Sequence, residues 1–384
     1  MDKTLYLHIG TPKTGTTSLQ HFCYYNSDIL TEKGYHYPKF PFKYPNKGWT
    51  RNGLFLESTL FDAEGIRQKE KETENFYSGL AELRELFKTY NNIILSDEGI
   101  WTACFNRKRG IPLMRKLQED AKDTGYQVKI IVYLRRQDDF LLSWYNQFIK
   151  HSLTVKNTLS WEEYFNNYEK YLELDYYSCL KKLEKIFGRE NIIVRRFDKK
   201  YLKDRSIIPD FLSIFGLELD DNFTIEEEHS NFNQKMSENA CEIKRIINGT
   251  TEMTIKDIRR FEWILREFSP VSEKNYPCSM MSDEESKNFM QLYELSNNKV
   301  VKRYIKDGQP LFNIERKPKE KWKKNNVYMT DDIIRFSCMS TLCIIQMIEE
   351  RDAQINEIKN TLQKALDHPF RFLIKKLLPF EKTL

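Results

Sequence analysis

Short runs of apolar residues alternate with longer amphipathic stretches along the first half of the chain. The apolar runs are rich in Ile, Val and Leu and cover Leu5–Ile9, Asn92–Ser96, Val128–Leu134 and Asn191–Arg196. Between them apolar residues recur at helical spacing, as in Phe76–Tyr90 and Leu113–Thr124. Such runs, separated by helical segments, are typical of buried parallel strands joined by crossovers. We therefore predict an α/β fold with a doubly wound, P-loop-like parallel sheet flanked by helices.

Beyond Lys199 the strand pattern fades and helical patterns dominate. The predicted helices cover Ile207–Phe215, Ser237–Ile247, Ile255–Glu267 and Glu284–Ile305. The segment Arg316–Lys324 carries six Lys or Arg against one Glu, which is typical of a solvated linker. We expect a catalytic domain in residues 1–313, a basic linker in residues 314–330 and a helical C-terminal extension in residues 331–384.

The C-terminal extension carries two apolar seams at heptad spacing. They comprise Ile344, Ile348, Ile355, Ile358, Leu362 and Ala365. Arg351 interrupts them, so packing of this helix on the body of the protein is the simpler interpretation. Pairing with another chain in a homo-oligomer is the alternative. The last segment, His368–Phe380, is basic and aromatic, and it either rests on an anionic membrane face or docks on the domain.

Composition excludes several classes of protein. With 384 residues, the chain is long enough for one large α/β domain with additions. A net charge of +5, from 61 Lys and Arg against 56 Asp and Glu, is too small for a dedicated nucleic-acid binder. The seven Cys form no CxxC pair, so we expect neither a zinc ribbon nor a disulfide framework. Without a secretory signal or an apolar stretch of about 20 residues, we expect a cytoplasmic protein.

The segment His8–Gln20 (HIGTPKTGTTSLQ) joins the first predicted strand to the first predicted helix. A glycine-rich loop at this position turns backbone N–H groups toward an anion at a helix N-terminus. Gly10 and Gly15 have the separation of the nucleotide-triphosphate loop GxxxxGK[ST], but Thr16 occupies the position of its lysine. The nearby cation is Lys13, inside the loop. Lys13 would therefore contact a terminal group and its bridging oxygen, and the hydroxyls of nearby threonines would cap phosphate oxygens.

This loop resembles the 5′-phosphosulfate loop of sulfotransferases that use 3′-phosphoadenosine 5′-phosphosulfate (PAPS). The residues that carry the resemblance are Gly10, Lys13, Thr14, Gly15, Thr16 and Thr17, and we expect Thr11 and Pro12 of the same loop to bind the donor with them. The KTGTT spelling is closer to the carbohydrate-modifying branch than to the KSGTT type. The resemblance implies PAPS as donor substrate with no metal ion, and a carbohydrate acceptor such as a cell-surface glycan. An acceptor of that kind, together with the basic tail, suggests an enzyme at the inner face of the membrane.

A second motif, Tyr133–Phe148, supports the resemblance. Arg135 lies at the end of the third predicted strand, and Ser143 follows eight residues later in a predicted helix. In the sulfotransferases an Arg and a Ser at this spacing bind the 3′-phosphate of the donor, and Arg135 and Ser143 are similar to them. Arg136 is the alternative ligand. One residue at a strand tip and one about two helical turns further on can face the same anion.

Sulfuryl transfer resembles phosphoryl transfer, in which catalysis is mainly positioning and charge stabilisation. We expect Lys13 to stabilise the leaving bridging oxygen, and a general base to take the proton of the acceptor hydroxyl. Glu98 is the best candidate, because it follows the second strand and ligands bind at the carboxyl ends of parallel strands. A carboxylate here could instead cap the next helix. His36 and His8 are rival bases.

The acceptor site is the least determined part of the prediction. Aromatic and basic residues follow the first helix, and they either line a sugar-binding rim or form a packed surface loop. They are Tyr35, Tyr37, Lys39, Phe40, Phe42, Lys43, Tyr44, Lys47, Trp49 and Arg51. Two rival functions stay open. A P-loop kinase or NTPase would use the IILSDE segment for magnesium, and a noncatalytic scaffold would act through its C-terminal helix.

Overall fold

The structure, a computed structural model, describes residues 3–40, 50–57, 59–62, 66–150, 157–225, 235–250, 255–313 and 318–367. These residues form two compact units. The first contains the described residues up to 150, those of 157–235, and 278–322. The second contains the described residues of 236–277 and those from 323 onward. The second unit thus combines helices that we had assigned to the catalytic domain with the C-terminal extension.

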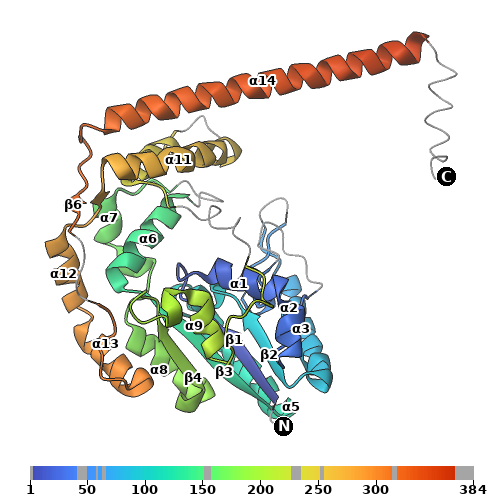
Figure 1. Ribbon diagram of the computed structural model, residues 1–384, viewed down its shortest axis with the longest axis vertical. Coiled ribbons are helices and arrows are strands. Elements are labelled where there is room, and N and C mark those ends of the chain that lie inside the picture. Colours follow the sequence, from blue (N-terminus) through green and yellow to red (C-terminus); the bar gives the residue numbers. More distant parts are fainter. Residues whose placement is uncertain are drawn as a thin grey trace. The chain divides into compact units, whose positions relative to one another are not determined.

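A four-stranded parallel sheet forms the centre of the first unit (Figure 1). Its order is β2 (Asn92–Ser96), β1 (Lys3–His8), β3 (Tyr126–Leu134) and β4 (Ile192–Arg196). Each strand lies within two residues of its prediction. Leu5, Leu7 and Ile130 have no exposed surface, as expected of strands that are covered on both faces.

Helices cover both faces of this sheet, which confirms the α/β fold class. On one face, α1 (Thr16–Tyr25) and α9 (Ile207–Ser213) pack in a cluster that includes Phe22, Tyr133 and Phe211. On the other, α5 (Gly110–Thr124) and α8 (Tyr176–Phe187) contact β3, and α3 (Lys69–Thr89) packs beside α5. The crossovers between successive strands contain these helices, as parallel pairing requires.

Smaller elements complete the first unit. They are α2 (Ser27–Glu32), η1 (Leu54–Leu56), α4 (Gly99–Trp101), the π-helix η2 (Thr102–Asn106), α6 (Gln137–Lys150), α7 (Trp161–Phe165), η3 (Tyr168–Lys170), η4 (Arg189–Asn191), η5 (Lys203–Arg205), α12 (Asp283–Gln291), α13 (Glu294–Val300) and the π-helix η7 (Val301–Ile305). The single helix predicted over Glu284–Ile305 is therefore three elements. The short strands β5 (Cys278–Ser279) and β6 (Glu320–Lys321) pair in parallel, and the second lies inside the predicted linker.

The outer edge of β2 is covered by two neighbouring segments of the chain. His36 donates its N–H to the Asn92 carbonyl (2.9 Å) and accepts from the Ile94 N–H (2.8 Å). Two residues further along β2, the Asn52 side chain donates to the Ile94 carbonyl (3.0 Å) and accepts from the Ser96 N–H (2.8 Å). Asn52 thereby holds the segment that contains Arg51 against the carboxyl end of β2.

In the described residues, the second unit consists of three helices, α10 (Glu238–Asn248), α11 (Ile255–Asn275) and α14 (Met329–Asp367). The predicted helical extension is confirmed by α14. The basic tail His368–Phe380, for which we considered membrane contact, lies outside the described residues. None of the described helices has the length and apolar character needed to cross a bilayer. All seven Cys are free thiols.

Candidate functional site

The predicted phosphate loop lies at the carboxyl end of β1, near the middle of the sheet. Its first residues continue the pairing with β3: Gly10 accepts from the Tyr133 N–H (2.7 Å), and the Thr11 N–H donates to the Tyr133 carbonyl (2.8 Å). Gly10 and Gly15 have φ angles of 101° and 73°, in the left-handed region that favours glycine. Because α1 begins at Thr16, the loop opens directly onto a helix N-terminus, where backbone N–H groups favour an anion.

Two of the four threonines stabilise the loop itself. The Thr11 hydroxyl donates to the Tyr133 carbonyl (3.1 Å), and the Thr14 hydroxyl donates to the Thr11 carbonyl (2.5 Å). Both side chains are buried, as are Pro12 and Thr16, whereas Thr17 is half-buried. The proton of the Thr14 hydroxyl is thus used inside the loop, whereas we had expected it to cap a phosphate oxygen.

Lys13 and Arg135 come from motifs 122 residues apart and meet in the folded chain. The Arg135 guanidinium donates from Nη1 to the Lys13 carbonyl oxygen (2.8 Å). The Lys13 ammonium donates to the side-chain oxygen of Gln147 on α6 (2.6 Å). Ser143 lies four residues before Gln147, so the two share one face of this helix. Lys13, Arg135 and Ser143 therefore lie in the same region of the first unit.

The two neighbouring arginines have different environments. The Arg136 guanidinium donates to both carboxylate oxygens of Asp138 (3.0 and 3.1 Å) and to the Asn313 carbonyl (2.6 Å). The Arg135 guanidinium lies 6.0 Å from the centroid of the Phe197 ring, makes a single hydrogen bond, and forms no ion pair with any residue that the structure describes. Burial lowers the pKa of the Arg135 guanidinium, outweighing Tyr176 and Asp138, but an arginine stays charged at neutral pH. Arg135 is therefore the arginine of this pair with donors available to an anion.

Glu98 lies directly against the phosphate loop. A Cβ atom added to Gly10 would lie 3.1 Å from the Cβ of Glu98, so the two backbones are in close contact there. The Glu98 carboxylate accepts from the Gln20 side chain on α1 (2.7 Å). The N–H of Gly99, at the start of α4, is bound by Asp97 Oδ1 (2.7 Å). Asp97 therefore binds the N-terminus of this helix. The Glu98 carboxylate does not cap it and accepts from Gln20 instead.

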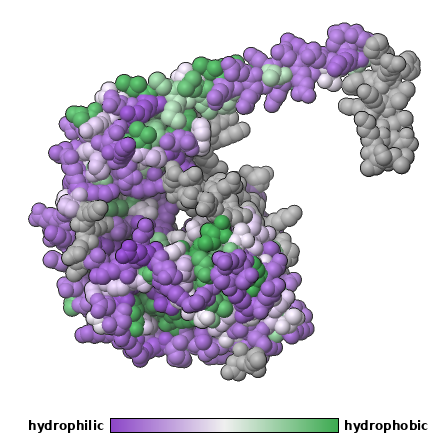
Figure 2. Space-filling view, viewed as in Figure 1, coloured by the Kyte–Doolittle hydropathy of each residue, from purple (hydrophilic) through white to green (hydrophobic). Residues whose placement is uncertain are grey.

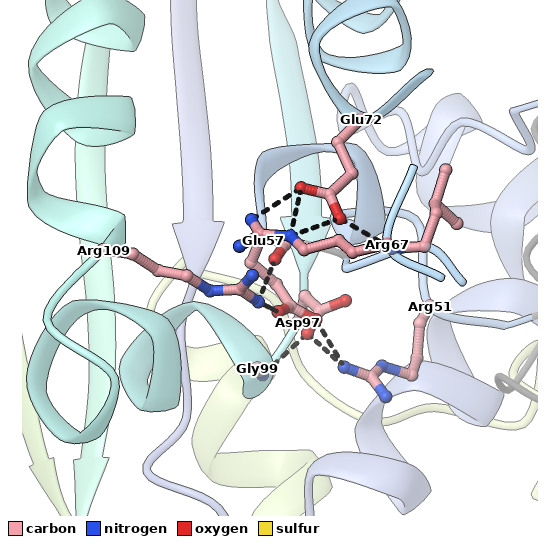
Figure 3. A network of polar contacts seen from close by, with 8 residues as sticks. Arg51, Glu57, Arg67, Glu72, Asp97, Gly99 and Arg109 are labelled. Atoms are coloured by element: carbon pink, nitrogen blue, oxygen red, sulfur yellow. Dashed lines mark hydrogen bonds and ion pairs between the residues drawn. The ribbon is translucent and has the colours of Figure 1, made fainter. Parts of the chain in front are cut away.

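Three carboxylates, of which Figure 3 labels Glu57 and Asp97, surround the guanidinium of Arg51. Arg51 donates to Asp97 and lies 3.7 Å from Glu57 and 3.9 Å from Glu98. Arg109 Nη2 donates a hydrogen bond to the Glu57 carbonyl oxygen (2.8 Å) and lies 3.5 Å from the Glu57 carboxylate. Figure 3 shows Arg51, Glu57, Asp97 and Arg109 converging from separate segments, with the bidentate Arg67–Glu72 pair beside them.

Asp97 and Glu98 have shifted pKa values. Burial acts to raise the pKa of Glu98, but Arg51 and the hydrogen bond from Gln20 bring it below its ordinary value. Burial raises the pKa of Asp97 against the effect of Arg51, with Glu57 and Glu98 adding to the increase. Glu98 is therefore the carboxylate of this pair that stays ionised at neutral pH. Among the described residues, no group of three or more His, Cys, Asp or Glu is arranged to hold a metal ion.

The two histidines considered as bases differ from Glu98 in their environment. His8 is fully buried, with Nδ1 bound to the Ser96 hydroxyl (2.8 Å), and burial lowers its pKa to about 4. His36 stacks on Tyr90 and pairs with the first residues of β2, so it lies at the amino edge of the sheet. The phosphate loop is at the carboxyl edge.

The aromatic and basic segment after α1 is partly a packed loop. Tyr37 is buried and donates to the Thr50 carbonyl (2.8 Å), while Tyr35 donates to the Phe215 carbonyl (3.1 Å). Lys39 lies over the ring of Tyr24, with 4.4 Å between its ammonium and the ring centroid. Residues 41–49, which include Phe42, Lys43, Tyr44, Lys47 and Trp49, lie outside the described residues.

Sequence reasoning did not identify the roles of Arg51, Gln20 and Gln147. Gln147 has a weak signal in its spacing of four from Ser143, which any helix would give. Arg51 was grouped with the acceptor rim, because nothing in the local pattern links it to a carboxylate 46 residues away.

No protein-family model matches the chain. A stretch of 177 residues is 28% identical to an uncharacterized protein of Archaeoglobus fulgidus. The match covers 46% of this chain and 46% of that protein, so the chain spans about half the length of this relative.

Proposed function

We propose that this protein is a sulfotransferase that moves the sulfuryl group of PAPS to a hydroxyl group of a carbohydrate. The observation that carries the proposal is the contact between Lys13 and Arg135. It joins the loop suited to a 5′-phosphosulfate to the arginine suited to a 3′-phosphate. PAPS carries anionic groups at both positions, so one donor molecule could engage both motifs.

In this proposal the donor is held by backbone and side chains without a metal ion. The loop from Gly10 to Thr17 binds the 5′-phosphosulfate with its N–H groups, at the N-terminus of α1. Arg135 and Ser143 bind the 3′-phosphate, and the available donors of Arg135 suit the geometry of phosphate oxygens. The absence of a side chain at Gly10 lets the loop approach both its neighbour Glu98 and a ligand.

The transfer step follows from these positions. The acceptor oxygen forms a bond to sulfur while the bond from sulfur to the 5′-phosphate oxygen breaks, which releases 3′,5′-ADP and the sulfated acceptor. Lys13 stabilises the negative charge that develops on the leaving oxygen. Glu98 accepts the proton of the acceptor hydroxyl. Its carboxylate is ionised because of Arg51 and Gln20, and a weak base suffices where bond formation to the acceptor is little advanced.

The acceptor class is a part of this proposal that rests on the resemblance to carbohydrate sulfotransferases. A hydroxyl of a cell-surface or lipid-linked glycan, met in the cytoplasm at the inner membrane face, is the acceptor we propose. Comparing the mass spectra of glycans from cells with and without the enzyme would identify it through a mass difference of one sulfate group.

Calorimetry with two nucleotides separates this function from that of a kinase or NTPase. We expect 3′,5′-ADP to bind in the absence of metal, and ATP with Mg²⁺ to bind much more weakly. Binding of ATP–Mg²⁺ alone would replace the proposal with a nucleoside-triphosphate enzyme. Failure of both nucleotides to bind would favour a scaffold role. Transfer of labelled sulfate from PAPS to the glycan fraction is the direct measurement of activity.

A further inference from the structure

The first turns of α14 are held firmly by the other helices of the second unit. Asp332 is fully buried and accepts hydrogen bonds from Asn239 on α10 (2.9 Å) and Ser272 on α11 (2.5 Å). Phe336 makes an edge contact with Phe261 on α11, with 5.5 Å between the ring centroids. These contacts fix the beginning of α14 and its direction relative to α10 and α11.

The remainder of α14 has no comparable support. Every residue from Ile344 to Lys364 is exposed. In the described part of this stretch, side-chain hydrogen bonds stay within the helix, such as Thr361 to the Glu357 carbonyl (2.9 Å). Most helical stability in proteins comes from packing of an apolar face, and isoleucine is a weaker helix former than alanine or leucine. An Ile-rich helix of this length therefore requires a partner for its apolar face.

The apolar residues of this stretch occupy the two seam positions of a heptad. Their exposed fractions are 55% for Ile344, 53% for Ile348, 37% for Ile355, 67% for Ile358 and 59% for Leu362. The seam extends over three heptads to Ala365, which is the length at which a heptad pattern begins to indicate a coiled coil. The face of this part of α14 that Figure 2 presents is largely hydrophilic, as expected for the side away from such a seam.

We propose that Ile344–Ala365 pairs with the same segment of a second copy of this chain, in an antiparallel two-helix coiled coil. The heptad selects a helix with a matching seam as the partner, because each seam side chain inserts between four residues of the facing helix. An antiparallel pair centred on Ala353 places Ile344 opposite Leu362 and Ile348 opposite Ile358. Four of the aliphatic seam residues then have an aliphatic partner, and Ile355 faces Arg351.

Arg351 determines the direction of the pair. In a parallel, in-register pair, Arg351 of one copy faces Arg351 of the other within the apolar seam, which brings two like charges together. In the antiparallel pair it faces Ile355 and lies near Asp352 of the second copy, which carries the opposite charge. The repulsion between like charges is then replaced by attraction on both sides of the centre.

Sedimentation equilibrium of the full chain tests the pairing. We expect a dimer for the native sequence and a dissociation constant at least about 100-fold higher for Ile355→Glu/Ile358→Glu, because charges would be buried in the seam. The matched control, Ala353→Glu/Asn360→Glu, adds the same charge on the opposite face and should remain dimeric. A native chain that stays monomeric at all accessible concentrations would overturn the proposal, as would equal dissociation of both variants. Near-UV circular dichroism would verify that the body of each variant is folded.

Cysteine crosslinking tests the direction. In a Cys338→Ser/Cys343→Ser background, which removes the thiols of α14, Ile344→Cys/Leu362→Cys should crosslink two chains under oxidation. Ile344→Cys alone should not. Efficient crosslinking of that single variant would show a parallel pair and overturn the antiparallel arrangement.

Discussion

Replacing Arg135 with alanine should selectively remove recognition of a 3′-phosphate. One guanidinium nitrogen, Nη1, is already bound to the Lys13 carbonyl, which leaves Nε and Nη2 for phosphate oxygens. Each hydrogen bond to a charged group contributes about 1.5–3 kcal/mol, so two contribute about 3–6 kcal/mol. At about 1.4 kcal/mol per factor of ten, the affinity for 3′,5′-ADP should fall by at least roughly 100-fold.

The assay compares two ligands in order to separate loss of the phosphate contact from damage to the loop. Alanine at position 135 also removes the support of the Lys13 carbonyl, which would weaken 3′,5′-ADP and 5′-AMP alike. The quantity of interest is therefore the ratio of the two affinities, measured by isothermal titration calorimetry. We expect the native protein to prefer 3′,5′-ADP strongly and the Arg135→Ala variant to lose that preference.

Arg136→Ala is the matched control, since it removes the same side chain one residue away. It leaves the buried Asp138 without its cation, so it should lower the free energy of unfolding by about 3–5 kcal/mol. At a temperature where it remains folded, it should keep the preference for 3′,5′-ADP. If Arg135→Ala keeps the native ratio of affinities, or if Arg136→Ala loses it, the 3′-phosphate is bound elsewhere and our account of the two arginines is wrong.

Three further predictions concern the loop, the base and acid stability. Lys13→Ala should lower the transfer rate by roughly 100- to 1000-fold while thermal unfolding stays unchanged, and normal turnover would contradict its role on the leaving oxygen. Glu98→Gln should lower transfer by about 100- to 10,000-fold with native affinity for 3′,5′-ADP, and full activity would remove Glu98 as the base. His8 has a pKa of about 4 when folded against 6.5 ordinarily, so the unfolded chain binds its proton first and stability falls as the pH drops below 6.5. Because of His8, the free energy of unfolding measured by urea denaturation should fall by about 2 kcal/mol between pH 7 and pH 5. The His8→Gln variant should lack this part of the fall. An identical pH dependence in the variant would refute the assignment.

The sheet could be predicted from the sequence because its signal is local. A run such as Val128–Leu134 is short, rich in β-branched residues and apolar at nearly every position, which is typical of a strand buried on both faces. The helix predicted over Glu284–Ile305 was less successful, since the chain breaks between α12 and α13. Tyr293, at this break, has φ −104° and ψ 0° and hydrogen bonds through its hydroxyl to Tyr168. That contact joins residues 125 apart and leaves no trace in the local spacing of apolar residues.

The candidate site, too, could be predicted from the sequence only in part. Topology alone predicts that Glu98 lies near Gly10, because both follow parallel strands at their carboxyl ends. The choice between Arg135 and Arg136 could not be made from sequence, since both follow the same strand and have the same chemistry. It depends on which guanidinium Asp138 engages, and this is a matter of side-chain direction at the start of α6. The role of Arg51 was hidden for a similar reason, because Asn52 positions it by bonding to a distant strand.

The covering of β2 by His36 and Asn52 has a consequence for solubility. An edge strand with free N–H and C=O groups can recruit a strand from another molecule, which is a common route to aggregation. On this strand the outward groups from the Asn92 carbonyl to the Ser96 N–H are already occupied. Because Asn52 neighbours Arg51, the residue that blocks intermolecular sheet growth also anchors the charge beside Glu98. We therefore expect that loss of this one asparagine would both open the edge of β2 to fibrillar association and release Arg51 from its place beside Glu98.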